Sequence, residues 1–284
     1  MSESVTGRPR HIASARACLA LFKIRTMEAV QYRAAALAGA SIGIFWALIE
    51  VTVFSVFYTY ADYRADAPLS FSQILAYVWL GQSLHGLFFA NVDEEFHAKI
   101  VSGDVGVELC RPLDLYFHWF AKSAAGRFGR FWWRGLITLA AGCAIPVASM
   151  RLTPPASAAG FCLFLASVAV LFIMSTAYSM FIASVRLGVA WGDGPMFVMT
   201  LVSGLLSGAY LPLPLWPEFM QGFLTVQPFA GQLDLPVRLY SGAIRPGAGA
   251  AAVFALQIGW TLAFIAAGRL TMRGKLSKII IQGG

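Results

Sequence analysis

Residues 93–112 read DEEFHAKIVSGDVGVELCRP and form a polar island between two long apolar blocks. The first three residues of this island are acidic, which predicts the beginning of a helix, because acids complement the positive end of the helix dipole. Ser102 and Gly103 predict the end of this helix, because glycine adopts the left-handed cap conformation without strain. We therefore expect a short helix over about residues 93–100, followed by a break in the chain.

The island has two interpretations. Its composition alone favours a membrane loop that its charges keep in water. The alternative is a short cytoplasmic helix that docks on a partner protein.

The composition of the chain indicates a membrane protein. Of 284 residues, 58% are hydrophobic and only 12% are charged, whereas a soluble domain is about 25% charged. Apolar runs of about 20 residues without period-2 alternation favour transmembrane helices over an outer-membrane barrel. The first 33 residues carry charges throughout and do not resemble a signal peptide. The four cysteines are scattered and predict neither a metal site nor a disulfide framework.

Six apolar segments predict six transmembrane helices, so the expected fold is an all-α polytopic membrane protein. A moderately amphipathic stretch before the first span predicts an amino-terminal helix at the cytoplasmic membrane surface. A proline-dense stretch between spans five and six is too short to cross the bilayer and predicts an outer re-entrant helical segment. The polar stretch 232–246 separates that segment from the last span. The spans are expected at about residues 34–60, 71–91, 127–147, 159–185, 196–210 and 249–270.

These segments divide the chain into three parts. Residues 1–33 form a cytoplasmic tail and interfacial helix, residues 34–270 a six-span transmembrane domain, and residues 271–284 a basic cytoplasmic tail. The transmembrane domain includes the polar island at about residues 92–112 and the outer re-entrant segment at about residues 211–229.

The distribution of basic residues predicts the orientation of the chain. An even number of spans places both termini on one side of the membrane. Of the 21 lysine and arginine residues, only Arg64, Arg151, Arg238 and Arg245 then fall on the opposite side. Because basic residues concentrate on the cytoplasmic side, both termini and the polar island are expected in the cytoplasm.

Glu50, Gln82 and His85 are the polar residues within the expected spans that we single out. Glu50 is a functional candidate by default, because ionisable groups are costly at membrane depth, although it can also pair with a neighbouring helix or reach water. Gln82 and His85 share a helix face, which we expect to turn toward other helices. For His85 we favour a hydrogen-bonded packing residue over a catalytic one.

Two glycines of the fifth span predict a close contact. Gly204 and Gly208 lie about one turn apart, and small residues at this spacing allow helices to approach each other. The contact would lie within the chain or with a second membrane chain. The alternative is local flexibility before the proline-dense segment.

Nucleotide binding by the usual phosphate loop is excluded for this chain. Gly274-Lys275 is followed by Leu276 where that loop requires serine or threonine. A Ser/His hydrolase motif is also missing, because Ser203 and Ser207 lack the preceding glycine. No His-Glu-x-x-His zinc motif is present.

Two segments resemble the permease subunits of ABC-2-type transporters, in the bacterial branch that encodes its permeases as separate chains, with a transmembrane domain like that of type V exporters. The first segment runs from Ile100-Val-Ser-Gly-Asp to Glu-Leu-Cys-Arg-Pro112. The second includes Ser203-Gly204, Tyr210-Leu-Pro-Leu-Pro, Trp216-Pro217, Gln227-Pro228 and Tyr240-Ser-Gly242. The six-span layout and the amino-terminal helix fit the same family, although this chain has no large outer domain and no fused ATPase.

The resemblance implies a function and a set of partners. The chain would be a permease subunit, with a second, identical or paralogous permease chain and two ATP-binding cassette subunits, in the bacterial cytoplasmic (inner) membrane. The partner ATPase would bind ATP and Mg, with no cofactor or metal in this chain and no nucleic acid among the partners. The island helix would be the coupling helix seated on the ATPase, with these candidate residues: Asp93, Glu94, Glu95, His97, Lys99, Ser102, Gly103, Asp104 and Arg111.

Two other functions stay open at this point. A six-span intramembrane hydrolase would require Ser203 or His85 for a turnover that is independent of any ATPase. A membrane scaffold or receptor would keep its function when the partner no longer hydrolyses ATP. The polar island and the missing catalytic motifs favour the transporter.

Overall fold

The computed structural model describes residues 10–31, 33–60, 67–90, 94–102, 114–187 and 194–276, and this part of the chain contains helices and no strands. The long helices are α1 (Arg10–Gln31), α2 (Arg33–Tyr60), α3 (Phe71–Phe88), α6 (Leu115–Arg130), α8 (Ala158–Arg186), α9 (Gly194–Leu206) and α12 (Ala248–Leu276). The shorter ones are α4 (Glu94–Ser102), η2 (Phe131–Gly135), α7 (Leu136–Ala144), η3 (Ala148–Met150), η4 (Leu213–Leu215), α10 (Glu218–Val226), η5 (Pro228–Gln232) and α11 (Asp234–Tyr240).

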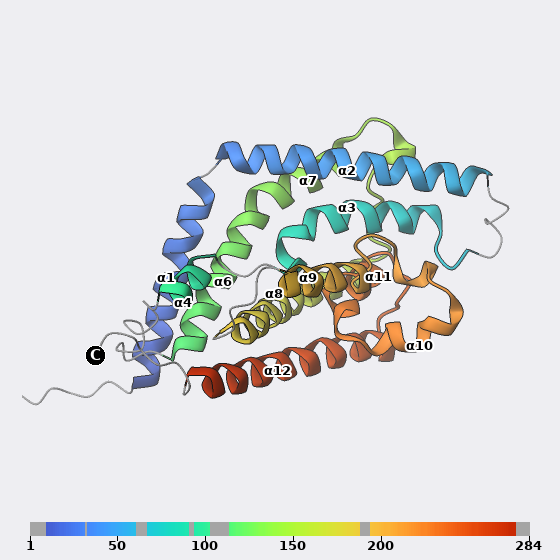
Figure 1. Ribbon diagram of the computed structural model, residues 1–284. Coiled ribbons are helices and arrows are strands. Elements are labelled where there is room, and N and C mark those ends of the chain that lie inside the picture. The colour runs from blue at the N-terminus through green and yellow to red at the C-terminus, as the bar shows by residue number, and fades with distance from the viewer. Residues whose placement is uncertain are drawn as a thin grey trace, which may run out of the picture.

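The long helices form a bundle with two distinct ends (Figure 1). Helices α2, α3, α8 and α12 run along a common direction. Helices α1 and α4 and the last turns of α12 lie at one end, on the left in Figure 1, and α10 lies at the other end. The short helices α4 and α10 therefore lie at opposite ends of the bundle.

Three helices have the length and apolar composition needed to cross a membrane. They are Ala34–Thr59, Ala158–Arg186 and Ala248–Leu276, and Met196–Leu206 is a shorter apolar helix. The expected third span is built from α6, η2 and α7 in direct succession, with a π-helical turn at η2. The prediction of an all-α membrane protein is confirmed for the described residues, and the count of six spans stays a prediction.

Helix α2 packs closely on η2 and α7 through two glycines. A Cβ atom added at Gly39 would lie 3.3 Å from Arg134 Cδ, and one added at Gly43 would lie 3.2 Å from Thr138 Oγ1. Both distances are tight, so the absence of a side chain on α2 allows this approach.

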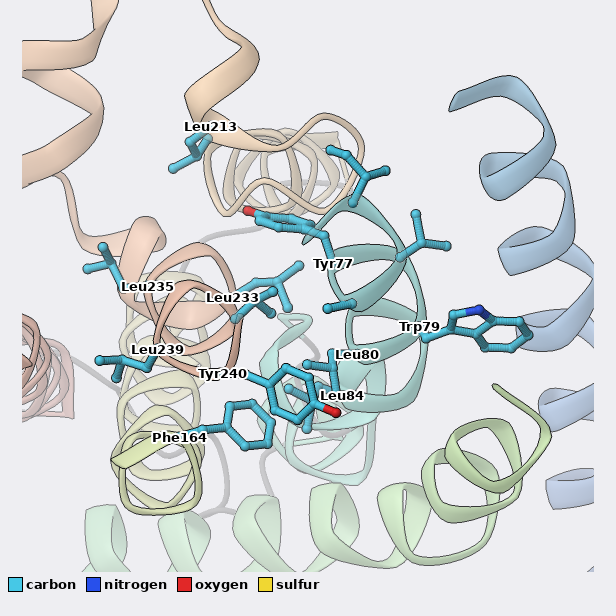
Figure 2. Close-up of a cluster of buried hydrophobic side chains, with 14 of the residues drawn as sticks. Tyr77, Trp79, Leu80, Leu84, Phe164, Leu213, Leu233, Leu235, Leu239 and Tyr240 are labelled. Carbon is cyan, nitrogen blue, oxygen red and sulfur yellow. The ribbon is translucent and has the colours of Figure 1, made fainter. Parts of the chain in front are cut away.

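The main core lies where α3 meets α11. Figure 2 shows Tyr77, Leu80 and Leu84 of α3 facing Leu233, Leu239 and Tyr240 around α11, with Phe164 of α8 beside them. The Tyr77 hydroxyl donates a hydrogen bond of 2.8 Å to Asp234 Oδ1, and both side chains are buried.

The core includes part of a stretch whose sequence is polar. The polar stretch 232–246 contains the buried helix α11. Its acid, Asp234, is stabilised there by Tyr77 and by Arg238, whose Nη1 lies 3.4 Å from Asp234 Oδ2. A buried carboxylate with two partners is compatible with a core, because its hydrogen bonds offset the cost of burial.

Candidate functional site

The polar island forms the short helix α4, which lies against α6 at the α1 end of the bundle (Figure 1). Phe96 is the buried anchor of α4, with 1% of its surface exposed. Its ring centroid lies 4.6 Å from that of Trp119 on α6. The Lys122 ammonium lies over the same Trp119 ring, 4.0 Å from its centroid. An aromatic pair with a cation on its face therefore attaches α4 to α6.

Glu95 adds an ionic attachment beside this aromatic pair. Its carboxylate is hydrogen-bonded by Lys122 at 2.8 Å and lies 3.1 Å from Lys99, one turn along α4. Arg25 of α1 pairs with the second carboxylate oxygen. Lys122 is nearly buried, with 6% of its side chain exposed. One acidic side chain of α4 thus connects α1, α4 and α6.

The charge environment of Glu95 favours its ionised form. Burial acts to raise the pKa of Glu95, but hydrogen bonds from Lys122 and Lys99, with the charges of Lys122 and Arg25, outweigh burial and lower the pKa to about 2. The carboxylate is therefore ionised at every physiological pH.

The candidate residues of the island have different positions. Glu95 and Lys99 contact residues of their own chain, so we assign Glu95 a positioning role. Ala98 and Ser102 are exposed on α4. Glu94 and His97 belong to the same helix. The remaining candidates, Asp93, Gly103, Asp104 and Arg111, lie outside the described residues.

The structure brings the three intramembrane polar candidates together. Gln82 Nε2 donates a hydrogen bond of 2.9 Å to Glu50 Oε1, which joins α3 to α2. Both residues and His85 line a cavity of about 20 Å³, which is room for about one water molecule. The His85 ring stacks on Phe89 with centroids 4.6 Å apart. Glu50 therefore pairs with a neighbouring helix, as one of the two interpretations of the sequence expected.

The two candidate glycines have different surroundings. Gly204 lies within α9, where an added Cβ would lie 3.2 Å from Phe89 and 3.1 Å from Tyr210. Gly208 follows the end of α9 and has φ of +87°, a conformation that favours glycine. The Tyr77 hydroxyl lies against Gly208, so the turn after α9 is held close to α3.

Residues 44–283 match a family described as an ABC-2 family transporter protein, which is most of the chain. The chain belongs to the ABC-2 transporter family. No curated protein matches the ABC-2 chain, and no solved structure matches it.

Membership of the ABC-2 family confirms the resemblance drawn from the sequence. The matched residues include α3, α4, α6, α8, α9 and α12, and most of α2. The chain is therefore a transport permease of the membrane, and ABC-2 permeases work with ATP-binding cassette components.

Sequence reasoning missed one buried residue of this ABC-2 permease. Arg127 of α6 is fully buried, and its Nη1 donates hydrogen bonds to the carbonyl oxygens of Leu87, at 2.9 Å, and Phe89, at 2.7 Å. Its Nη2 hydrogen-bonds the Ser179 hydroxyl of α8. Carbonyls at a helix end lack partners within the helix, so Arg127 caps α3.

The sequence contains a weak signal for this role. Arg127 stands between Gly126 and Gly129, and small neighbours permit the close packing that a buried arginine needs. From helical spacing alone, Arg127 is grouped with Arg130 and Arg134 as cations that either reach lipid headgroups or meet acids of a partner. In the structure, Arg127 is directed at protein carbonyls instead.

Proposed function

We propose that this chain is the transmembrane permease subunit of an ATP-binding cassette exporter. It would form the translocation pathway with a second permease chain, and two separate ATPase subunits would bind ATP with Mg and drive it. Helix α4 would be the coupling helix that sits on an ATPase subunit. Closure of the ATPase pair on ATP would then displace α4 and, with it, the transmembrane helices.

The attachment of α4 carries this proposal. A coupling helix must transmit force to the spans, and α4 is fixed to α6 by Phe96 on Trp119 and by Glu95 on Lys122. Helix α6 continues through η2 into α7 without a break. It also caps α3 through Arg127. A displacement of α4 would therefore reach α3, α6 and α7 together.

The distribution of charge supports the orientation that this function requires. Helices α1 and α4 and the carboxyl end of α12 share one end of the bundle (Figure 1), and most lysines and arginines belong to that side of the chain. We propose that this end faces the cytoplasm of a bacterial cell, with both termini there. Residues 1–33 and 271–284 would flank the transmembrane domain of residues 34–270.

The two alternative functions have no comparable support. The Ser203 hydroxyl donates to the Thr200 carbonyl at 2.8 Å, and the Ser207 hydroxyl donates to the Gly204 carbonyl at 2.9 Å. Both hydroxyls are thus used within their own helical turns, rather than being paired with a general base. A scaffold function would not require that α4 be attached firmly to α6.

Co-purification tests the proposed function. The tagged chain is extracted from its native membrane in mild detergents, and the proteins recovered with it are identified. We expect a stoichiometric ATP-binding subunit, and a second six-span chain in the same sample would show a heterodimer. Recovery of the chain alone in every detergent would contradict the proposal. A turnover lost in Ser203→Ala or His85→Ala, without any ATPase, would support the hydrolase instead.

A further inference from the structure

A pocket lined by both apolar and charged residues lies between the start of α6 and the end of α12. Its volume is about 190 Å³. Apolar lining comes from Leu115 of α6 and from Met272 and Leu276 of α12. Arg269 and Arg273 line the same pocket from the last turns of α12. A ligand that fits this lining carries a negative charge next to an apolar part.

The first arginine is fixed in place by its own chain. Arg269 Nη2 donates a hydrogen bond of 3.0 Å to Asp114 Oδ2, at the start of α6. Its guanidinium carbon lies 4.9 Å from the ring centroid of Phe117. An arginine held by one face has further N–H donors available for an anion, because guanidinium has five.

The second arginine supplies uncompensated charge. Arg273 is exposed one turn beyond Arg269, and no described residue forms an ion pair with it. Asp114 neutralises Arg269, so Arg273 leaves a net positive charge at the mouth of the pocket. Tyr116 also lines the pocket, and its buried hydroxyl has no hydrogen-bond partner among the described residues. Buried hydroxyls normally have a hydrogen-bond partner, so an unpartnered one beside this pocket is compatible with a polar ligand group there.

The length of α12 places this pocket at the membrane surface. Its 29 residues extend about 43 Å at 1.5 Å per residue, whereas the hydrocarbon core is about 30 Å thick. The charged residues of α12 all lie in its last eight residues, so we place the excess length at this end, in the headgroup layer. Arginines at this depth meet lipid phosphates, while the apolar residues that line the pocket beside them can contact the start of an acyl chain.

We propose that this pocket binds one anionic phospholipid. Its phosphate would lie between Arg269 and Arg273, and an acyl chain would run along Leu115 and Met272. The position at the end of α12 beside α6 would let the bound lipid hold these two helices together at the cytoplasmic surface. The site requires neither the ATPase nor a transported substrate.

Lipid titration of the purified full chain, followed by native mass spectrometry, tests this assignment. The probes are dioleoylphosphatidylglycerol, dioleoylphosphatidylcholine and soluble glycerol phosphate. We expect phosphatidylglycerol to bind more tightly than phosphatidylcholine, and glycerol phosphate to bind far more weakly than either lipid. Equal binding of both lipids would overturn the proposal. Glycerol phosphate binding as tightly as phosphatidylglycerol would show a site for free anions and would overturn the lipid assignment.

Matched variants locate the binding. Arg273→Gln should weaken phosphatidylglycerol binding about fivefold, as expected for one basic residue near an anionic surface, and leave phosphatidylcholine unchanged. Arg273→Lys should recover most of the affinity. Arg151→Gln removes the same charge from an exposed arginine outside the pocket and should have no effect. An equal loss in Arg273→Gln and Arg151→Gln would contradict the site, because it would show only the effect of net charge.

Discussion

Lys122 of α6 donates a 2.8 Å hydrogen bond to Glu95 of α4 while its ammonium lies 4.0 Å above the Trp119 ring. The two residues are 27 positions apart in the chain. This pair attaches α4 directly to α6.

The Glu95–Lys122 pair should show energetic coupling. Glu95→Gln and Lys122→Met should each lower the unfolding temperature in detergent. The double variant should lose less than the sum of the single losses, because either change alone breaks the same attachment. We expect a coupling free energy of about 0.5–1 kcal/mol, since the Glu95 side chain is about one-third exposed. Strict additivity would show that the two side chains do not interact.

Acidification should release α4 only at low pH. The pKa of Glu95 in the folded chain, about 2, lies below its ordinary value of 4.5. The stabilisation by Glu95 is therefore complete above about pH 5 and is lost as the pH falls through 4.5 toward 2.

A spin label at Ala98→Cys, with the four native cysteines replaced by serine, measures this release. Its mobility should be constant from about pH 5.5 to 8 and rise below about pH 4.5. Glu95→Gln serves as the control, because it should lack this acid transition. A transition near pH 6–7 in the parent chain would assign the attachment to a different titrating group.

Part of this site could be predicted from the sequence. The break at Ser102-Gly103 and the acidic start indicate a short helix, and α4 ends at Ser102. The partners of Glu95 could not be predicted, because Arg25 lies 70 positions earlier in the chain and Lys122 lies 27 positions later. Local periodicity contains no information about such pairs.

The same limit applies to the burial of α11. Asp234 is buried, and its hydrogen-bond donor Tyr77 lies 157 positions away, so no local pattern could have predicted this burial. Long apolar helices such as α2, α8 and α12 were predictable, because hydropathy and length are local properties.

Removal of Arg127 should destabilise the junction of α3 and α6. Arg127→Met leaves the carbonyls of Leu87 and Phe89 without their buried donor, at about 1–3 kcal/mol for each unsatisfied group. The unfolding temperature should fall clearly. Arg151→Met, at an exposed arginine, should change stability by less than about 0.5 kcal/mol. Equal unfolding temperatures for the two variants would contradict the capping role.

Replacement of Glu50 separates packing from transport. Glu50→Gln retains an oxygen that accepts the hydrogen bond from Gln82, so stability and ATP hydrolysis by the assembled complex should be preserved. Glu50→Leu leaves Gln82 without this acceptor and should cost about 1–3 kcal/mol of stability. If Glu50→Gln retains its unfolding temperature but abolishes transport, the ionisable carboxyl itself has a role in the pathway.

The central claim is that α4 contacts an ATP-binding subunit, and a photo-cross-linker at position 98 tests it most directly. Ala98 is exposed on α4, and a cross-linker at Phe219, exposed on α10 at the opposite end of the bundle, is the matched control. In native membranes, we predict a covalent product with the ATP-binding subunit from position 98 and none from position 219. A product from position 219 but not from position 98 would place the ATPase at the other end of the bundle and contradict the account.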